Sequence, residues 1–202
     1  MRRSPKITRK TDILNAATAS FLKDGYGASN IDDIAKRAGV SKPTVYKHYD
    51  SKFDLFCQMI YKMVNGPNEE GLYLAHAKKL EPKEGLTYIA GKMVNKFYRE
   101  DLILLYRLII SESSNFPEMN EALAQCFCNS CHENMNALLT HYAQKGLLKI
   151  EDPEIATNQF IVLLEVPVIF RLFMRRDNLP DTVERQEIIE RTVDMFWHYY
   201  KN

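Results

Sequence analysis

The chain has 202 residues, of which 46% are hydrophobic, enough for a sizeable core, and only 8 are glycine and 8 proline. Because it also lacks runs of alternating β-branched residues bounded by turns, an all-α fold is favoured over a β-rich one. Residues 1–52 carry a net charge of +6 (11 Lys and Arg, 5 Asp and Glu), whereas residues 53–202 carry −5 (16 and 21). A basic N-terminal part joined to an acidic remainder is typical of a nucleic-acid-binding domain linked to a domain with another role.

The first ten residues include five basic side chains: Arg2, Arg3, Lys6, Arg9 and Lys10. Because no apolar run follows them, we expect a basic arm that reaches DNA phosphates or a minor groove rather than a secretory signal. The longest apolar run, over 160–174, is interrupted by Glu165, Pro167 and Arg171 and is shorter than a bilayer requires. These features predict a cytoplasmic protein with no membrane partner.

Two short helices joined by a tight turn are predicted over residues 31–49, after a supporting helix over 11–23. Asn30 is the expected N-cap of the first short helix, and Gly39 ends it by adopting a left-handed backbone conformation. Ser41 is the expected N-cap of the second helix, with Pro43 in its first turn. Such a pair is a helix-turn-helix, which places its second helix in the DNA major groove; a hairpin used only for packing is the alternative.

The second helix of this motif has a cationic, hydroxyl-rich outer face. Val45 and Tyr49 are expected to face inward, which leaves for DNA the side chains of Lys42, Pro43, Thr44, Tyr46, Lys47 and His48. Among these, Lys42, Thr44, Tyr46 and Lys47 are expected to reach base edges, with phosphate binding as the alternative for Tyr46 and His48. The remaining candidate DNA contacts are Asn30, Lys52, Arg2, Arg3 and Lys6. Of these, Lys52 and the three residues of the arm are expected to bind phosphates.

Residues 13–56 strongly resemble the DNA-binding domain of the TetR/AcrR family of bacterial repressors. The resemblance rests on the ordered set Gly25-Tyr26-Gly27, Ile34-Ala35, Ala38-Gly39-Val40-Ser41, Thr44-Val45-Tyr46, Tyr49 and Ser51-Lys52. Pro43 and Tyr49 depart from the Gly and Phe that family members more often carry. The resemblance implies a three-helix helix-turn-helix domain at residues 1–50 and a larger helical domain for effector binding and dimerisation at residues 51–202.

The remainder of the chain is expected to be helical throughout. Apolar spacing, caps and prolines predict helices over 51–65, 68–79, 83–98, 102–113, 117–145, 153–175 and 181–200. Pro167 predicts a kink in the helix over 153–175. The helix over 51–65 directly follows the helix-turn-helix, and we expect it to be the only covalent and packed connection between the DNA-binding domain and the other helices.

Residues 106–173 are also similar to the ligand-binding half of the AefR-like branch of the same family, through the spacing of Phe116-Pro117, Gly146 and Asp152-Pro153. This similarity implies a dimer formed by the last two long helices. The residues agree, because the segment 160–174 is apolar nearly all round its helix and must cover two faces. We therefore expect a homodimer through helices near 154–175 and 181–200, with a monomer in which both helices are central as the alternative.

Aromatic and methionine side chains are frequent in the C-terminal part, and most of them are expected to form core. The family resemblance implies an apolar effector pocket there, whose candidate lining residues are Phe97, Tyr98, Tyr106, Phe127, Cys131, Met135, Phe160 and Leu164. The candidates for the few polar groups of such a pocket are Tyr98, Tyr106, Asn134, His141 and Glu165.

Four cysteines, Cys57, Cys126, Cys128 and Cys131, do not form the paired spacing of a zinc site, and a disulfide is not expected in the cytosol. No serine elbow, glycine-rich phosphate loop or zinc-protease motif is present, so we expect no enzyme activity, no catalytic residue, no metal and no cofactor.

The sequence thus predicts a homodimeric transcriptional regulator, a repressor, that is released from a palindromic double-stranded operator by a small apolar or amphipathic effector. The alternatives are a repressor that senses redox state through Cys126, Cys128 and Cys131, and a helical enzyme with an accessory nucleic-acid-binding module.

Overall fold

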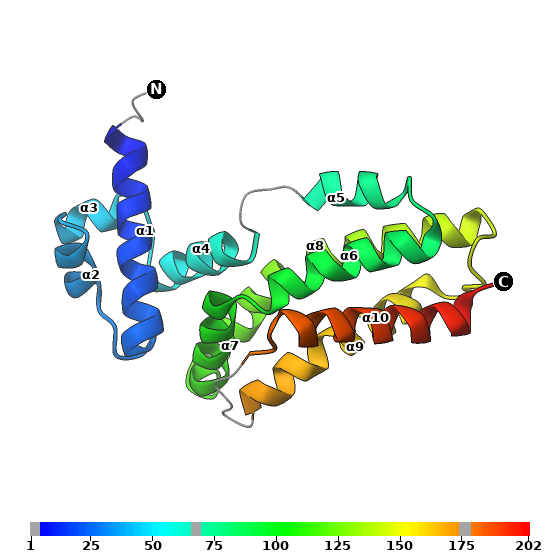
Figure 1. The fold of residues 1–202 in the computed structure, drawn as a ribbon. Coiled ribbons are helices and arrows are strands. Elements are labelled where there is room, and N and C mark those ends of the chain that lie inside the picture. Colours follow the sequence, from blue (N-terminus) through cyan, green and yellow to red (C-terminus); the bar gives the residue numbers. More distant parts are fainter. Residues whose placement is uncertain (1–4, 66–69, 174–178) are drawn as a thin grey trace. The chain divides into compact units, whose positions relative to one another are not determined.

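The computed structural model describes residues 5–65, 70–173 and 179–202, with the backbone alone at 5–8, 65, 70–72, 123–130, 172 and 173. Ten helices account for nearly all of these residues, and the described part of the chain holds no strand, only an isolated bridge between Leu148 and Lys201 (Figure 1). The predicted all-α fold is confirmed.

The chain divides into two compact units, and each contains segments that are distant in sequence. The first unit holds residues 1–66 and 104–126, and the second holds residues 67–103 and 127–202. The predicted functional boundary after residue 50 stays a prediction, because it separates roles rather than compact bodies. The chain crosses between the units three times, after residues 66, 103 and 126. These crossings concern the compact units, so they do not test the expectation that the helix over 51–65 is the only covalent connection between the helix-turn-helix and the remaining helices.

The first unit contains α1 (Pro5–Asp24), α2 (Ile31–Arg37), α3 (Lys42–Tyr46) and α4 (Lys52–Asn65). Helix α1 packs against α2 and α4, because its apolar face is fully buried at Ile13, Ala17 and Phe21. The unit also contains the later part of α7 (Glu100–Glu112) and the start of α8 (Glu118–Gln144).

Helix α1 begins six residues earlier than the predicted helix over 11–23, so Lys6, Arg9 and Lys10 belong to a helix and not to an extended arm. Proline suits the first turn, and lysine and arginine are good helix formers, which explains the extension. Tyr49 supports it, because its hydroxyl donates a 3.0 Å hydrogen bond to the carbonyl oxygen of Lys10.

The helix ends largely follow the predicted caps. The side-chain oxygen of Asn30 accepts a hydrogen bond from the Asp33 N–H at 2.9 Å, and Gly39 has a φ of 67° at the turn. Ser41 occupies the N-cap position of α3, but its hydroxyl pairs with the hydroxyl of Thr44 at 2.8 Å instead of capping the backbone.

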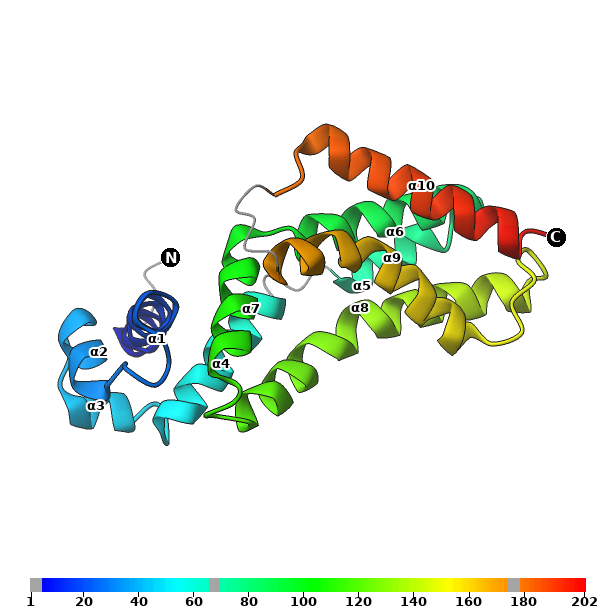
Figure 2. The ribbon, with the colours of Figure 1, turned by 90° about the horizontal axis from the view of Figure 1, so that it is seen from below.

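The second unit contains α5 (Glu70–Ala77), α6 (Pro82–Phe97), α9 (Pro153–Phe173), α10 (Thr182–Tyr200) and most of α8. Helix α6 packs against α5, α9 and α10, and α10 also contacts α9 (Figures 1 and 2). The core of the second unit is apolar, with Leu86, Ala90 and Val94 of α6 fully buried. The predicted C-cap is confirmed at Gly146, which has a φ of 66°.

Candidate nucleic-acid interface

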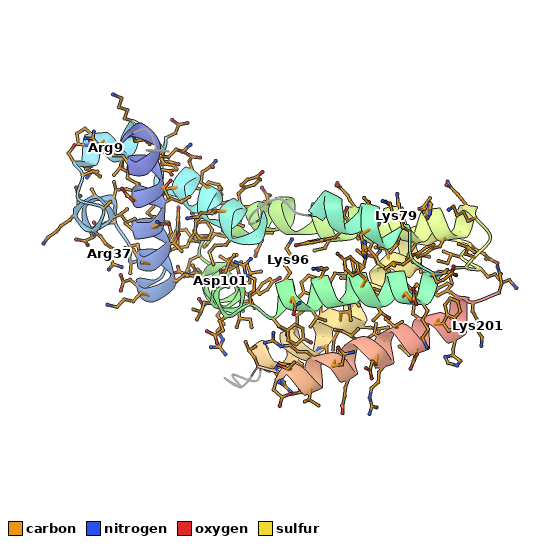
Figure 3. All side chains as sticks on the ribbon, turned by 45° about the horizontal axis from the view of Figure 1, so that its top comes forward. Arg9, Arg37, Lys79, Lys96, Asp101 and Lys201 are labelled. Atoms are coloured by element: carbon orange, nitrogen blue, oxygen red, sulfur yellow. The ribbon has the colours of Figure 1, made fainter. Side chains whose placement is uncertain are left out.

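The outer face of α3 is built on two buried side chains. Val45 and Tyr49 are almost completely buried, as predicted, and they fix the short helix against the rest of the first unit. Lys42, Pro43, Tyr46 and Lys47 are consequently exposed, whereas Thr44 and His48 are half-buried. Tyr46 keeps 47% of its surface exposed, so its ring and hydroxyl are accessible to a ligand such as DNA. Arg9 on α1 and Arg37 on α2 add cationic side chains to this unit (Figure 3).

Lys42 pairs with an acidic side chain of the preceding helix. Its ammonium nitrogen lies 2.8 Å from Oδ2 of Asp32, and this hydrogen bond, together with the charge of Asp32, raises the pKa of Lys42. Both side chains are exposed, so the pair is weak and can exchange for a contact to DNA.

Asn30 has a structural role in the free protein. Its amide oxygen caps α2, and its amide nitrogen donates a 2.7 Å hydrogen bond to the carboxylate of Asp33. A contact of Asn30 with DNA stays a prediction. Arg2 and Arg3 lie outside the described residues, as does the side chain of Lys6, so their predicted phosphate contacts are also untested.

Lys52 holds the loop that joins α1 to α2 (residues 25–30, the α1–α2 loop). Its ammonium group donates hydrogen bonds to the carbonyl oxygens of Tyr26 at 2.7 Å, Ser29 at 2.9 Å and Gly27 at 3.4 Å. Burial lowers its pKa, and the nearby carboxylate of Glu112 partly offsets that effect. Since a lysine has three N–H donors, a phosphate can bind Lys52 only by displacing one of these carbonyls.

Glu112, at the end of α7, contacts the same loop from the other side. Its two carboxylate oxygens each lie 3.2 Å from the backbone nitrogen of Gly27, whose N–H they accept. Beside it, the rings of Tyr26 and Phe116 meet edge to face with centroids 5.0 Å apart. The expectation that the helix over 51–65 is the only packed connection of the helix-turn-helix was therefore wrong. Contacts 85 residues apart in sequence carry no local signal, so sequence reasoning could not find Glu112.

The candidate effector residues are distributed over both units. Phe97, Tyr98, Met135, Phe160 and Leu164 are buried in the second unit, and Cys131 is half-buried there. Tyr106 belongs to the first unit and is half-buried, so the structure does not group it with the others. Phe127 has a side chain outside the description.

Among the polar candidates, Tyr98 is already engaged. Its hydroxyl donates a 3.1 Å hydrogen bond to the carbonyl oxygen of Leu164, and burial raises its pKa to about 12. Burial alone raises the pKa of the Glu165 carboxyl group to about 7. Within the described residues, Nε2 of His141 is a buried nitrogen without a hydrogen-bond partner.

The two cysteines whose side chains the structure describes belong to different units. Cys57 lies on α4 in the first unit and Cys131 on α8 in the second, both half-buried. The side chains of Cys126 and Cys128 are outside the description. Within the described residues no group of three His, Cys, Asp or Glu side chains is placed to hold a metal ion. Neither the redox alternative nor the absence of a metal is tested by this arrangement.

Helix α9 has two apolar faces. Phe160, Leu164 and Val168 are buried on one face, and the other presents exposed apolar side chains at Ile155, Val162, Val166, Ile169 and Phe170. Exposed apolar residues continue on α10 at Val183, Met195 and Tyr199. The helix starts at Pro153, as predicted, and is longer than the apolar run over 160–174, so by length and composition it could cross a membrane. Its packing on α6 and α10 instead matches a helix of a folded domain with one uncovered face.

Comparisons with known proteins agree with both halves of this arrangement. The model of the bacterial regulatory proteins of the tetR family matches residues 13–59, and the model of the AefR-like transcriptional repressor C-terminal domain matches residues 84–202, more than half of the chain. The chain belongs to the TetR family. This family consists of DNA-binding transcriptional regulators and not of enzymes.

Individual relatives give the same result. The chain is 41% identical over 63 residues to the transcriptional activator FasR of Mycolicibacterium smegmatis, a match that spans 31% of the chain and 29% of FasR. It is 25% identical to the transcriptional regulator TtgR of Pseudomonas putida, over 96% of the chain and 93% of TtgR. A TetR-family regulator from Mesorhizobium loti MAFF303099 has the same fold, with a TM-score of 0.86, 24% identity and coverage of 99% and 100% of the two chains.

Proposed function

We propose that this TetR-family protein is a cytoplasmic homodimeric repressor, which binds a palindromic operator through α3 of each chain and leaves it when an effector binds. The observation that carries the proposal is the outer face of α3, where Lys42, Tyr46 and Lys47 are exposed over the buried Val45 and Tyr49. A short helix with exposed lysine donors and an exposed ring is suited to the major groove.

Recognition is divided between base edges and phosphates. Lys42, Thr44, Tyr46 and Lys47 are the candidates for base edges, and the basic residues before α1 and in its first turns are the candidates for phosphates. Two such units related by a two-fold axis would read half-sites about 34–36 Å apart, or a multiple of one helical turn.

Selection of bound DNA from a random pool tests the DNA-binding function directly. We expect the selected sequences to share an inverted repeat. Lys42→Ala should then lose affinity at particular base positions by about 1–3 kcal/mol, with little change on random DNA. Lys149→Ala, which removes the same charge from an exposed position in the second unit, is the matched control. Failure to enrich any sequence, or an equal loss on selected and random DNA, would contradict the proposal.

The exposed apolar side chains of α9 and α10 support the homodimer. A two-fold axis through this surface would pack two helices from each chain into a four-helix interface and cover side chains such as Phe170, which is 58% exposed in the single chain. The same packing explains why α9 is apolar on two faces without crossing a membrane.

The second unit is the proposed effector-binding part. Phe97, Met135, Phe160 and Leu164 give it an apolar interior. His141, whose Nε2 has no hydrogen-bond partner, and Glu165, whose pKa is raised by burial, supply polar groups there. This combination favours a small apolar or amphipathic effector. To convert a dimer from 99% DNA-competent to 1%, the effector must favour the released state by about 5.5 kcal/mol.

A screen of apolar and amphipathic compounds for release of the selected operator tests this part of the proposal. Any compound found must bind less tightly when the operator is saturating, because the coupling between two ligands is reciprocal. An affinity that is unchanged by operator DNA would rule out the proposed coupling.

A further inference from the structure

The α1–α2 loop is shaped around the carboxylate of Glu112. Gly25 has a φ of 87°, and a Cβ atom at this position would lie 2.5 Å from Oε1 of Glu112. At Gly27 a Cβ atom would lie 3.1 Å from the other carboxylate oxygen and 3.2 Å from the ring of Phe116. Two glycines therefore allow the loop to approach α7 and the start of α8 closely.

The loop is held by opposite charges from two different helices. The carboxylate of Glu112 accepts the N–H of Gly27, while the ammonium of Lys52, on α4, donates to the carbonyl oxygens of Tyr26 and Ser29. The ammonium also lies 4.4 Å from the centroid of the Tyr26 ring. That ring contacts Phe56 of α4 and Phe116 near the start of α8, with centroid distances of 5.0 Å in each case.

The position of this loop fixes the helices that follow it. Ser29 donates a 2.6 Å hydrogen bond from its hydroxyl to the carbonyl oxygen of Gly25, which closes the loop on itself. The next residue, Asn30, caps α2, and α2 contacts α3. Gly27 is consequently linked to α2 and α3 through Ser29, which closes the loop, and Asn30, which caps α2. Glu112, Phe116, the loop and α3 all belong to the first compact unit.

We propose, on the basis of the DNA-binding function proposed above, that Glu112 is a positioning residue for operator recognition. Its carboxylate holds Gly27, and with it the α2–α3 pair, to the end of α7, so that a displacement of α7 changes the orientation of α3 without passing through α4. The chain enters the first unit at residue 104, so α7 itself carries the signal across the boundary between the units.

Hydrogen exchange of the full-length protein tests this role in two steps. In the free protein, Glu112→Ala should speed exchange of the Gly27 amide by roughly tenfold, as expected for the loss of a hydrogen bond to a charged acceptor. Glu112→Gln keeps one oxygen acceptor and should retain part of the protection of the Gly27 amide. This second variant keeps the test possible if the alanine variant folds poorly. Glu121→Ala, an exposed glutamate of α8 in the same unit, is the matched control for charge and should leave Gly27 unchanged.

The second step measures transmission, with DNA selected from the random pool as the ligand. Saturating DNA should slow exchange in residues 104–116 of the wild type and of Glu121→Ala, and this effect should be largely lost in Glu112→Ala at equal saturation. A structural role alone would not remove the response of α7 to DNA.

The proposal is overturned if Gly27 exchanges equally in Glu112→Ala and Glu121→Ala, or if α7 responds to DNA equally in both. If the wild type selects no DNA, the proposed function fails, whereas the exchange of Gly27 in the free protein still decides whether Glu112 holds the loop.

Discussion

The hydroxyl of Tyr142 on α8 donates a 2.8 Å hydrogen bond to the carbonyl oxygen of Ala77 at the end of α5, and Gly85 of α6 lies directly beneath this bond. A Cβ atom at residue 85 would be 1.9 Å from the Tyr142 hydroxyl and 2.9 Å from the Ala77 carbonyl oxygen. Tyr142 is fully buried, and this burial raises its pKa to about 12. Three helices of the second unit therefore meet where only a glycine fits.

Gly85→Ala should destabilise the protein by about 1–3 kcal/mol, because the added methyl group must push Tyr142 away from Ala77. Gly91→Ala, in the same helix, is the matched control. No atom lies within 4 Å of its added Cβ, so the change should stabilise the protein by about 0.5–1 kcal/mol through helix propensity. Urea unfolding of both variants measures the difference, and equal effects of the two changes would show that the contact at Gly85 is not tight.

Local features of this fold could be predicted from sequence, and long-range contacts could not. Single residues cap or end several helices, namely Asn30, Gly39, Gly146 and Asp181. Because such residues stand next to the apolar runs of the helices, the predicted helix ends agree with the observed ends to within a few residues in nearly all cases. The early start of α1 was missed because Tyr49 supports it through the Lys10 carbonyl, 39 residues away.

The candidate site shows the same division. Burial of Val45 and Tyr49 followed from helical periodicity, and with it the exposed face of α3. The hydrogen bonds that Lys52 donates to the loop carbonyl oxygens, and the one that Gly27 donates to Glu112, depend on tertiary structure. The sequence does not indicate them, because the backbone groups involved are the same at every residue. Tyr106 was grouped with the effector residues through the family resemblance, and although it belongs to the first unit, its role stays a prediction.

Glu165 should make stability depend on pH. Its folded pKa of about 7 lies above the usual value of 4.5, so the ionised carboxylate destabilises the folded protein above pH 7, and this cost disappears as pH falls toward 4.5. Glu165→Gln should therefore be more stable than the wild type by about 1–3 kcal/mol at pH 8 and no different near pH 4.5. Unfolding free energies of the two proteins between these pH values measure the difference.

Glu133→Gln, an exposed glutamate of α8 in the second unit, is the control and should show no such pH-dependent gain. A constant difference between Glu165→Gln and the wild type across this range would contradict the assigned burial of the carboxyl group.

Lys52→Met separates loop support from phosphate binding. Methionine has a similar length but cannot donate to the carbonyl oxygens of Tyr26 and Ser29, so stability should fall by about 1–3 kcal/mol. We expect that Lys52 only supports the loop, so that the slope of log operator affinity against log salt concentration is the same for Lys52→Met as for the wild type. If it binds a phosphate in the complex, the magnitude of the slope falls by about 0.9. Lys23→Met, an exposed lysine of α1, controls for the lost charge and should leave stability unchanged.

The apolar face of α9 and α10 determines the last prediction. Val166 is 49% exposed in the single chain, so Val166→Glu should fold normally but bring a charge to the centre of the proposed dimer interface. Light scattering should then give the chain mass of 23.5 kDa for the variant and twice that mass for the wild type. Operator affinity should fall by at least about 100-fold, because two half-sites can no longer be bound by one linked pair of chains.

Ile110→Glu is the matched control, since Ile110 is 50% exposed on α7, away from α9 and α10 in sequence and in the other compact unit. It should remain a dimer. A wild-type mass of one chain at micromolar concentration would contradict the proposed homodimer, and a dimer that survives Val166→Glu would mean that another surface joins the two chains. In that case the exposed stripe of α9 would need a different occupant, because its apolar side chains are too numerous and too aligned to remain in water without a partner.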